Sequence, residues 1–175
     1  MTTTRPPAGE GPDPWAAERC ALLDALRAQR AHVLAALDGL PEQALRRPVL
    51  PSGWTCLGLV QHLALDVERF WFRAVVAGED VDLAEGDGAW RVPTGTPAAA
   101  VLDAYRAEAA RSDAVVAATP LDAPPARWPA DVFPGLPRRG LRATVLHVLT
   151  ETACHAGHLD AARELLDGHQ HLVLT

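Results

Sequence analysis

The chain contains no lysine, so all 16 of its basic residues are arginine, against 22 acidic residues. The resulting formal charge of −6 disfavours a nucleic acid as the main partner, because neutralising phosphates requires a basic surface. No apolar run approaches the roughly 20 residues that cross a bilayer, so we expect no membrane partner. Residues 1–12 lack the apolar core of a secretory signal, and we expect a disordered tail on a cytoplasmic protein.

Cysteines are few and far apart, at Cys20, Cys56 and Cys154, with no Cys-x-x-Cys pair. This spacing argues against a disulfide framework and against a cysteine zinc site. We expect buried apolar thiols instead. Cys154 stands beside a histidine, but neighbouring helical side chains point about 100° apart, which weakens a catalytic interpretation. The sequence also lacks an internal repeat, a Gly-rich phosphate loop and strand-like alternation.

Apolar residues recur at helical spacing in four segments, which predicts an all-α four-helix bundle. Prolines near the helix starts and glycines near the stops place the helices at about 13–39, 55–77, 97–119 and 141–167. Long loops then separate helices two and three, at 79–95, and helices three and four, at 120–140. We expect 41–53 to be a loop and the Pro-rich, aromatic stretch 120–140 to fold back over the bundle. The expected domain spans 13–168, followed by a tail at 169–175.

The last predicted helix carries four metal-capable side chains in one stripe: His147, Glu151, His155 and His158. Residues three and four apart lie on one helix face, with Cβ atoms about 5–6 Å apart. Imidazole nitrogen and carboxylate oxygen are good ligands for zinc and similar divalent ions. The flanking residues are apolar, which favours a buried metal site over a solvated face, although a buried hydrogen-bond network would have the same spacing.

A third ligand is expected from the second helix, where His62 is surrounded by core residues and Asp66 lies one turn further on. Three protein ligands leave a position open for water or substrate, which is the catalytic pattern. Glu151 with His155 can converge on one ion, but so can His147 with Glu151, or His155 with His158, and spacing alone does not choose. Gly157, inside the helix, suggests close approach of a neighbour or substrate. We interpret His32 as an ordinary boundary histidine and assign no role to the histidines after residue 168.

Three motifs of the chain are also those of a known superfamily: residues 51–55 (Pro-Ser-Gly-Trp-Thr), His62-Leu63 followed by residues 67–72, and residues 151–160. The chain resembles the DinB-like four-helix superfamily, in the branch of mycothiol-dependent enzymes that includes maleylpyruvate isomerase and the mycothiol S-transferases. The likeness covers nearly everything from Trp15 to Gly168, and its last motif is the most specific. Thr150 and Cys154 depart from the usual residues of that branch without removing a ligand.

The resemblance implies a divalent metal, usually zinc, held by His62, Glu151 and His155. It implies that His158 and His147 support the site. Trp54 and Trp71 are candidate pocket residues, although a place in the core explains both of them better. The implied function is a thiol S-transferase in which a metal-bound thiolate of mycothiol attacks a small electrophile. A thiol-dependent isomerase, a metal-dependent hydrolase and a non-catalytic metal- or ligand-binding protein remain as alternatives. A homodimer is expected only from the habit of the family.

Overall fold

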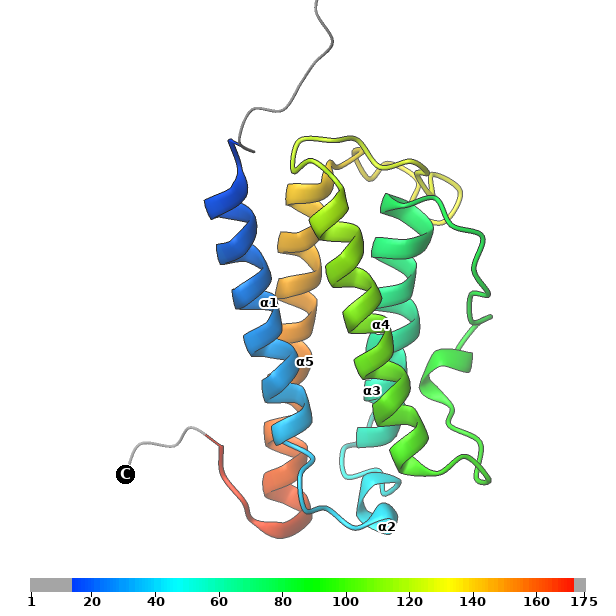
Figure 1. The fold of residues 1–175 in the computed structure, drawn as a ribbon. Coiled ribbons are helices and arrows are strands. Elements are labelled where there is room, and N and C mark those ends of the chain that lie inside the picture. The colour runs from blue at the N-terminus through cyan, green and yellow to red at the C-terminus, as the bar shows by residue number, and fades with distance from the viewer. Residues whose placement is uncertain (1–13, 172–175) are drawn as a thin grey trace, which may run out of the picture.

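Four long helices pack side by side in the computed structural model, which describes residues 14–171 (Figure 1). They are α1 (Ala16–Ala35), α3 (Cys56–His62) with its continuation η1 (Leu63–Val76), α4 (Ala98–Ala118) and α5 (Leu141–Asp167). The described residues include no strand. The predicted all-α bundle is therefore confirmed, while the predicted tail 1–12 lies outside the described residues, as do residues 172–175.

The helix ends follow local side-chain chemistry. Thr55 caps α3 by accepting a hydrogen bond from the Gly58 amide at 3.0 Å, as its position predicts. Gly168 ends α5 in the left-handed conformation, with φ 78°, which a residue without a Cβ adopts at little cost. The first helix is shorter than expected, because α1 begins at Ala16 after the turn at Trp15 and passes into turns after Ala35.

Two predicted loops contain short helices. The segment 41–53 includes the single helical turn α2 (Glu42–Leu45), and the segment 79–95 includes the 3₁₀ turn η2 (Gly88–Trp90). Both turns are too short to show a helical repeat of apolar residues, which is why the sequence pattern did not reveal them. The long segment that contains η2 runs along the outer side of α3 and η1 (Figure 1).

The second bundle helix changes its winding immediately after His62. From Leu63 to Val76 it is a π-helix, in which hydrogen bonds span five residues rather than four. Most of its buried residues form adjacent pairs every four positions, and Ala74 is buried beside the last pair: Leu63–Ala64, Val67–Glu68, Trp71–Phe72 and Val75–Val76. That repeat is longer than the 3.6 residues of an α-turn, so looser winding keeps the pairs turned toward the core.

The Pro-rich segment 120–140 folds over one end of the bundle, as predicted (Figure 1). The Ala126 and Arg127 amides donate to the Val76 and Val75 carbonyls at 3.1 and 3.0 Å. These bonds satisfy carbonyl groups that the end of η1 would otherwise leave without partners. At the start of α5, the Leu141 and Arg142 amides donate back into the same segment.

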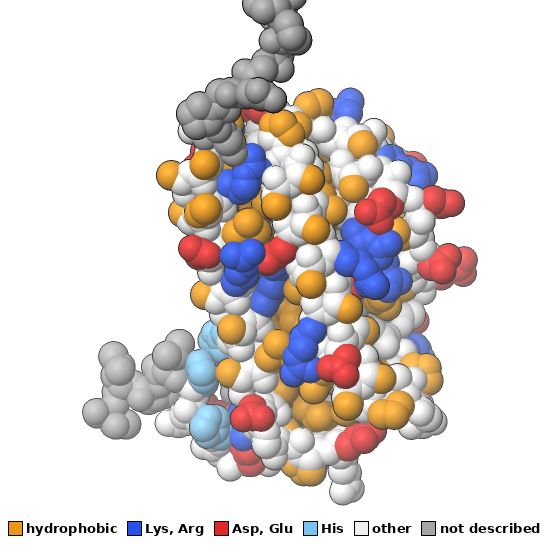
Figure 2. All heavy atoms as spheres, viewed as in Figure 1, with side chains coloured by type: hydrophobic (Ala, Val, Ile, Leu, Met, Phe, Trp, Pro, Cys, Tyr) orange, Lys and Arg blue, Asp and Glu red, His pale blue; other side chains and the backbone are white. Residues whose placement is uncertain are grey.

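Arginine forms most of the ion pairs between helices, and two of the carboxylates that it binds are buried. Glu68 on η1 is fully buried and accepts from Arg30 on α1 through both carboxylate oxygens, each at 2.7 Å. Arg30 also donates to Asp113 on α4 at 2.6 Å. Glu108 on α4, 1% exposed, accepts from Arg69 and other arginines. On the outside, charges of both signs are interspersed with apolar side chains over α1 and α4 (Figure 2).

The cysteine prediction holds at one of three positions. Cys56 is 1% exposed, and burial raises the pKa of its thiol to about 11. Cys20 and Cys154 are exposed, so the expectation of buried thiols is wrong for both. Each lies on the outer face of a helix whose other faces carry the packed residues, and a thiol is small enough to be tolerated there.

Within residues 14–171, no helix is both long enough and apolar enough to span a membrane.

The Arg30–Glu68 pair gives a prediction about stability. Replacing Glu68 with Leu removes both oxygens that Arg30 binds and leaves a guanidinium that is 5% exposed with Asp113 as its remaining anion. Losing one partner of a buried pair costs about 3–5 kcal/mol, so Glu68→Leu should lower the free energy of unfolding by about that amount, measured by urea denaturation.

The matched control is Tyr105→Phe on α4. Tyr105 is also buried, and its hydroxyl has no hydrogen-bond partner in the structure. Removing a buried hydroxyl that makes no bond should change the free energy of unfolding by less than about 1 kcal/mol. Equal losses in the two variants would show that general disruption of the core, rather than the ion pair, governs stability here.

Candidate metal centre

His62 lies at the end of α3, where the α-helix passes into the π-helix. Its Nδ1 is 2.9 Å from Oδ2 of Asp66, one turn later. Since an ionised carboxylate only accepts, the ring donates from Nδ1, and Nε2 is left with its lone pair. A carboxylate behind a ligating histidine fixes its ring and its tautomer. Asp66, a candidate ligand from the sequence, is therefore placed as the residue that orients His62.

Trp90 covers the other side of His62, with parallel rings 4.1 Å apart between centroids. The amide of Gln61 holds this tryptophan in place by donating to the carbonyls of Gly88 and Ala89 at 3.1 and 3.0 Å. The turn η2 approaches α3 so closely that a Cβ on Gly58 would lie 2.4 Å from the Trp90 carbonyl oxygen. Sequence reasoning did not identify Trp90, because it stands in an acidic loop without periodicity.

His155 faces His62 from α5, edge to face, with ring centroids 5.2 Å apart. Its Nε2 is 3.8 Å from Oε2 of Glu151, and its Nδ1 is 3.3 Å from Nδ1 of His158. The two nitrogens of His155 thus have different neighbours, a carboxylate on one side and an imidazole on the other. The structure brings His62, Glu151, His155 and His158 together from two helices.

The electrostatics of this cluster suit a metal ion. Burial, together with the nearby His62, lowers the pKa of His155 to about 4. His155 is therefore neutral at pH 7, with a lone pair available to a cation. Three imidazoles and a carboxylate form a donor set that zinc and related ions prefer. The residues present fit a divalent metal.

A pocket of about 580 Å³ opens beside the cluster. It is lined by Ser52, Gly53, Trp54, Asp87, Trp90 and Arg91. Trp90 stacks on His62, and Trp54 is 6.2 Å from His158 between ring centroids, so the two tryptophans connect the pocket to the histidines. The pocket is large enough for a small organic substrate.

His147 and Trp71 form a separate contact further along α5. Their rings meet edge to face at 4.8 Å, and Trp71 also stacks on Phe133 of the Pro-rich segment. Eight residues separate His147 from His155, which is about 12 Å along a helix. Burial lowers the pKa of His147. The structure therefore places His147 and Trp71 with the segment 120–140 rather than beside His62.

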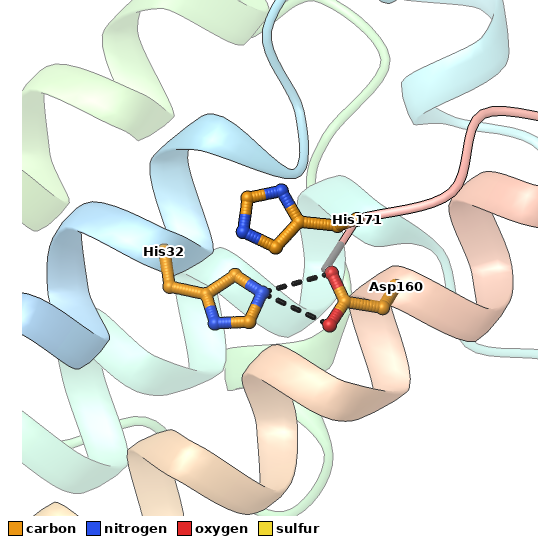
Figure 3. Close-up of side chains that lie close together, drawn as sticks. All are labelled: His32, Asp160 and His171. Carbon is orange, nitrogen blue, oxygen red and sulfur yellow. Dashed lines mark hydrogen bonds and ion pairs between the residues drawn. The ribbon is translucent and has the colours of Figure 1, made fainter. Parts of the chain in front are cut away.

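A second group of metal-capable side chains was not identified from the sequence. His32, Asp160 and His171 converge from α1, α5 and the segment after α5 (Figure 3). Among the described residues, this is the group whose ligand atoms all lie within 4.8 Å of one another. The ligand atoms of His62, Glu151 and His155 lie further apart than those of this second group. The Glu151 side chain is also 42% exposed.

Comparison with known families decides where the chain belongs. The model of the family described as mycothiol-S-transferase matches residues 21–168. The chain belongs to the mycothiol-S-transferase family. No curated protein matches the chain.

Membership in the mycothiol-S-transferase family implies an enzyme that acts on a thiol, mycothiol. The matched residues run from α1 to the end of α5 and so include both clusters apart from His171. The resemblance seen in the sequence is confirmed at the level of the family.

The Asp66–His62 contact predicts a role in metal affinity. Asp66→Ala removes the acceptor that fixes the His62 ring, and loss of such a partner weakens metal binding by about 10–100-fold. The zinc affinity is measured by titrating metal-free protein with zinc in a calorimeter. Asp103→Ala is the control, because Asp103 is an exposed partner of Arg106 on α4. An unchanged affinity in Asp66→Ala would contradict the assigned role.

Replacing a glycine with alanine should have opposite effects on stability at Gly58, which η2 approaches closely, and at Gly157, which it does not. Gly58→Ala should lower the free energy of unfolding by about 1–3 kcal/mol, because the Trp90 carbonyl must move. Gly157→Ala should raise it by up to about 1 kcal/mol, because Gly157 lies within α5 and its Cβ would meet nothing within 4 Å. Thermal denaturation of both variants measures the difference.

The open space at Gly157 contradicts the expectation of a packed neighbour, while the expectation that a substrate approaches this turn stays a prediction. No described residue approaches this glycine closely. Destabilisation by Gly157→Ala would show that α5 is constrained at this turn after all.

Proposed function

We propose that this protein is a metal-dependent S-transferase that joins mycothiol to a small electrophile. His62, Glu151 and His155 would hold a divalent ion, and zinc is the ion that the donor set favours. The observation that carries the proposal is the meeting of His62 with His155 and Glu151, from two different helices, beside a pocket lined by tryptophans. Membership of the mycothiol-S-transferase family supports the choice of thiol.

The reaction requires a thiol that has lost its proton, because thiolate rather than thiol is the nucleophile. A bound divalent cation would supply the positive charge that favours thiolate near neutral pH. In the transfer, the proton of the thiol passes to solvent and sulfur forms a bond to an electrophilic carbon. The leaving group departs with the electron pair of the bond that breaks.

The chain's own residues would position the reactants. Asp66 orients His62 through Nδ1, and His158 contacts His155 at Nδ1, so both rings are restrained from behind. Trp90 covers His62 and keeps water from that face of the ring. Trp54 and Trp90 offer apolar surface in the pocket, where an electrophile can lie beside the bound thiol.

A conjugation assay tests the function. Protein loaded with zinc is mixed with mycothiol and an activated aryl chloride, and the thioether product is followed by absorbance. Wild type should form product, and both His62→Ala and His155→Ala should lower kcat/KM by on the order of 100-fold, together with the metal content of the purified protein.

Cys154→Ser is the matched control, because this exposed thiol neighbours His155 in the sequence. Its activity should equal that of wild type if mycothiol supplies the attacking sulfur. Loss of activity in Cys154→Ser would indicate that the thiol of Cys154, rather than that of mycothiol, attacks the electrophile. Full metal content without turnover of any thiol would favour a binding protein over an enzyme.

A further inference from the structure

His32, Asp160 and His171 meet at the end of the bundle where the C-terminal segment leaves α5. Nε2 of His32 is 2.9 Å from each carboxylate oxygen of Asp160. The ring of His171 lies over that of His32, with centroids 4.2 Å apart and planes 28° from parallel. Figure 3 shows the three side chains reaching toward one another from α1, α5 and the segment that follows α5.

The chemistry of the group is that of a metal site. Two imidazoles and one carboxylate are ligands that zinc and other late first-row divalent ions accept. Their ligand atoms all lie within 4.8 Å of one another, while the donors around a tetrahedral zinc ion lie about 3.3 Å apart, given ligand distances of about 2.0 Å. Coordination would draw these atoms together and requires the His171 ring, now stacked on His32, to turn until its lone pair points at the same ion.

The site is also accessible to an ion. The side chains of His32 and Asp160 are 17% and 26% exposed, and His171 is half-buried. The group is thus partly shielded from water, which strengthens attraction between a cation and a carboxylate, yet it is open enough for an ion to enter.

We propose that His32, Asp160 and His171 form a second divalent-metal site, which fastens the C-terminal segment to α1 and α5. Each ligand comes from a different segment, so an ion there crosslinks all three. In the described part of that segment, the His169 amide donates to Asp167 and Gln170 donates to Glu164, both on α5, so the ion would add a link to α1.

This site is separate from the cluster around His155. Asp160 follows Glu151 by nine residues, which places it about 180° around α5. Asp160 therefore faces α1, while Glu151 and His155 face the side of α3. The two groups share no residue, so each can be removed without altering the ligands of the other.

In the absence of an ion, the same geometry is a hydrogen bond between His32 and Asp160 with a histidine stacked on it. That alternative makes a different prediction for His171. Stacking without coordination would leave the metal content of the protein unchanged when His171 is replaced, whereas coordination requires the loss of an ion.

Measuring the metal content of the full chain distinguishes coordination by His171 from stacking without an ion. Metal-free protein is loaded with excess zinc, passed through gel filtration and analysed for zinc and protein. Wild type should hold one ion more than His171→Ala, and His32→Ala and Asp160→Ala should match His171→Ala. His169→Ala is the control, because this neighbouring exposed histidine lies outside the group and should leave the count at that of wild type.

A second measurement isolates the site from the one assigned to the proposed function. In a His155→Ala background, zinc should still raise the melting temperature, because an ion that binds only the folded state stabilises it. Adding His171→Ala should abolish that shift. Equal zinc content in His171→Ala and wild type, or a shift that survives in the double variant, would overturn the second site without bearing on S-transfer.

Discussion

The buried carboxylate of Glu68 is the constraint on which the arrangement of the bundle depends. A fully buried anion must be paired, and the bidentate contact with Arg30 satisfies it. Arg30 reaches Asp113 as well, so one guanidinium joins α1, η1 and α4. A slip of any of these helices by one residue would separate the charges in an apolar core. Because Glu68 follows His62 by six residues on the same continuous helix, the pair also fixes how far His62 is rotated toward α5.

The local winding of the second bundle helix then determines how the His62 ring is placed. The change from α- to π-helix falls directly after His62, and it keeps four pairs of core residues facing inward over the following fourteen positions. Before the change, Gly58 and Gln61 admit and hold the turn η2, which lays Trp90 on His62. One side of the ring is therefore determined by the helix and the other by a loop 28 residues away. Neither contact is visible as a spacing of residues.

Contacts within one helix can be predicted from the sequence, whereas contacts between separate elements cannot. Neighbours within one helix are encoded by spacing, and for that reason the contacts of His155 with Glu151 and His158 and the caps at Thr55 and Gly168 follow from the sequence. His147, the fourth residue of the predicted stripe, lies against Trp71 instead. Pairings between elements depend on the packed register. The contact of His32 with Asp160 joins residues 128 positions apart, and Trp90 lies in a segment with no periodic pattern. Exposure at Cys20 and Cys154 likewise depends on which helix face the neighbours leave uncovered.

The bundle is built from two closely packed pairs of helices, α1 with α5 and η1 with α4. The residues around His155 come from both pairs, since His62 ends α3 and Glu151 and His155 lie on α5. Their separation is thus set by whatever holds one pair against the other. The Arg30 contacts with Glu68 and Asp113 cross that boundary, from α1 to η1 and to α4. Because α5 packs on α1 as well as on η1 and α3, the buried ion pair between α1 and η1 helps to set the distance between imidazoles that it does not touch.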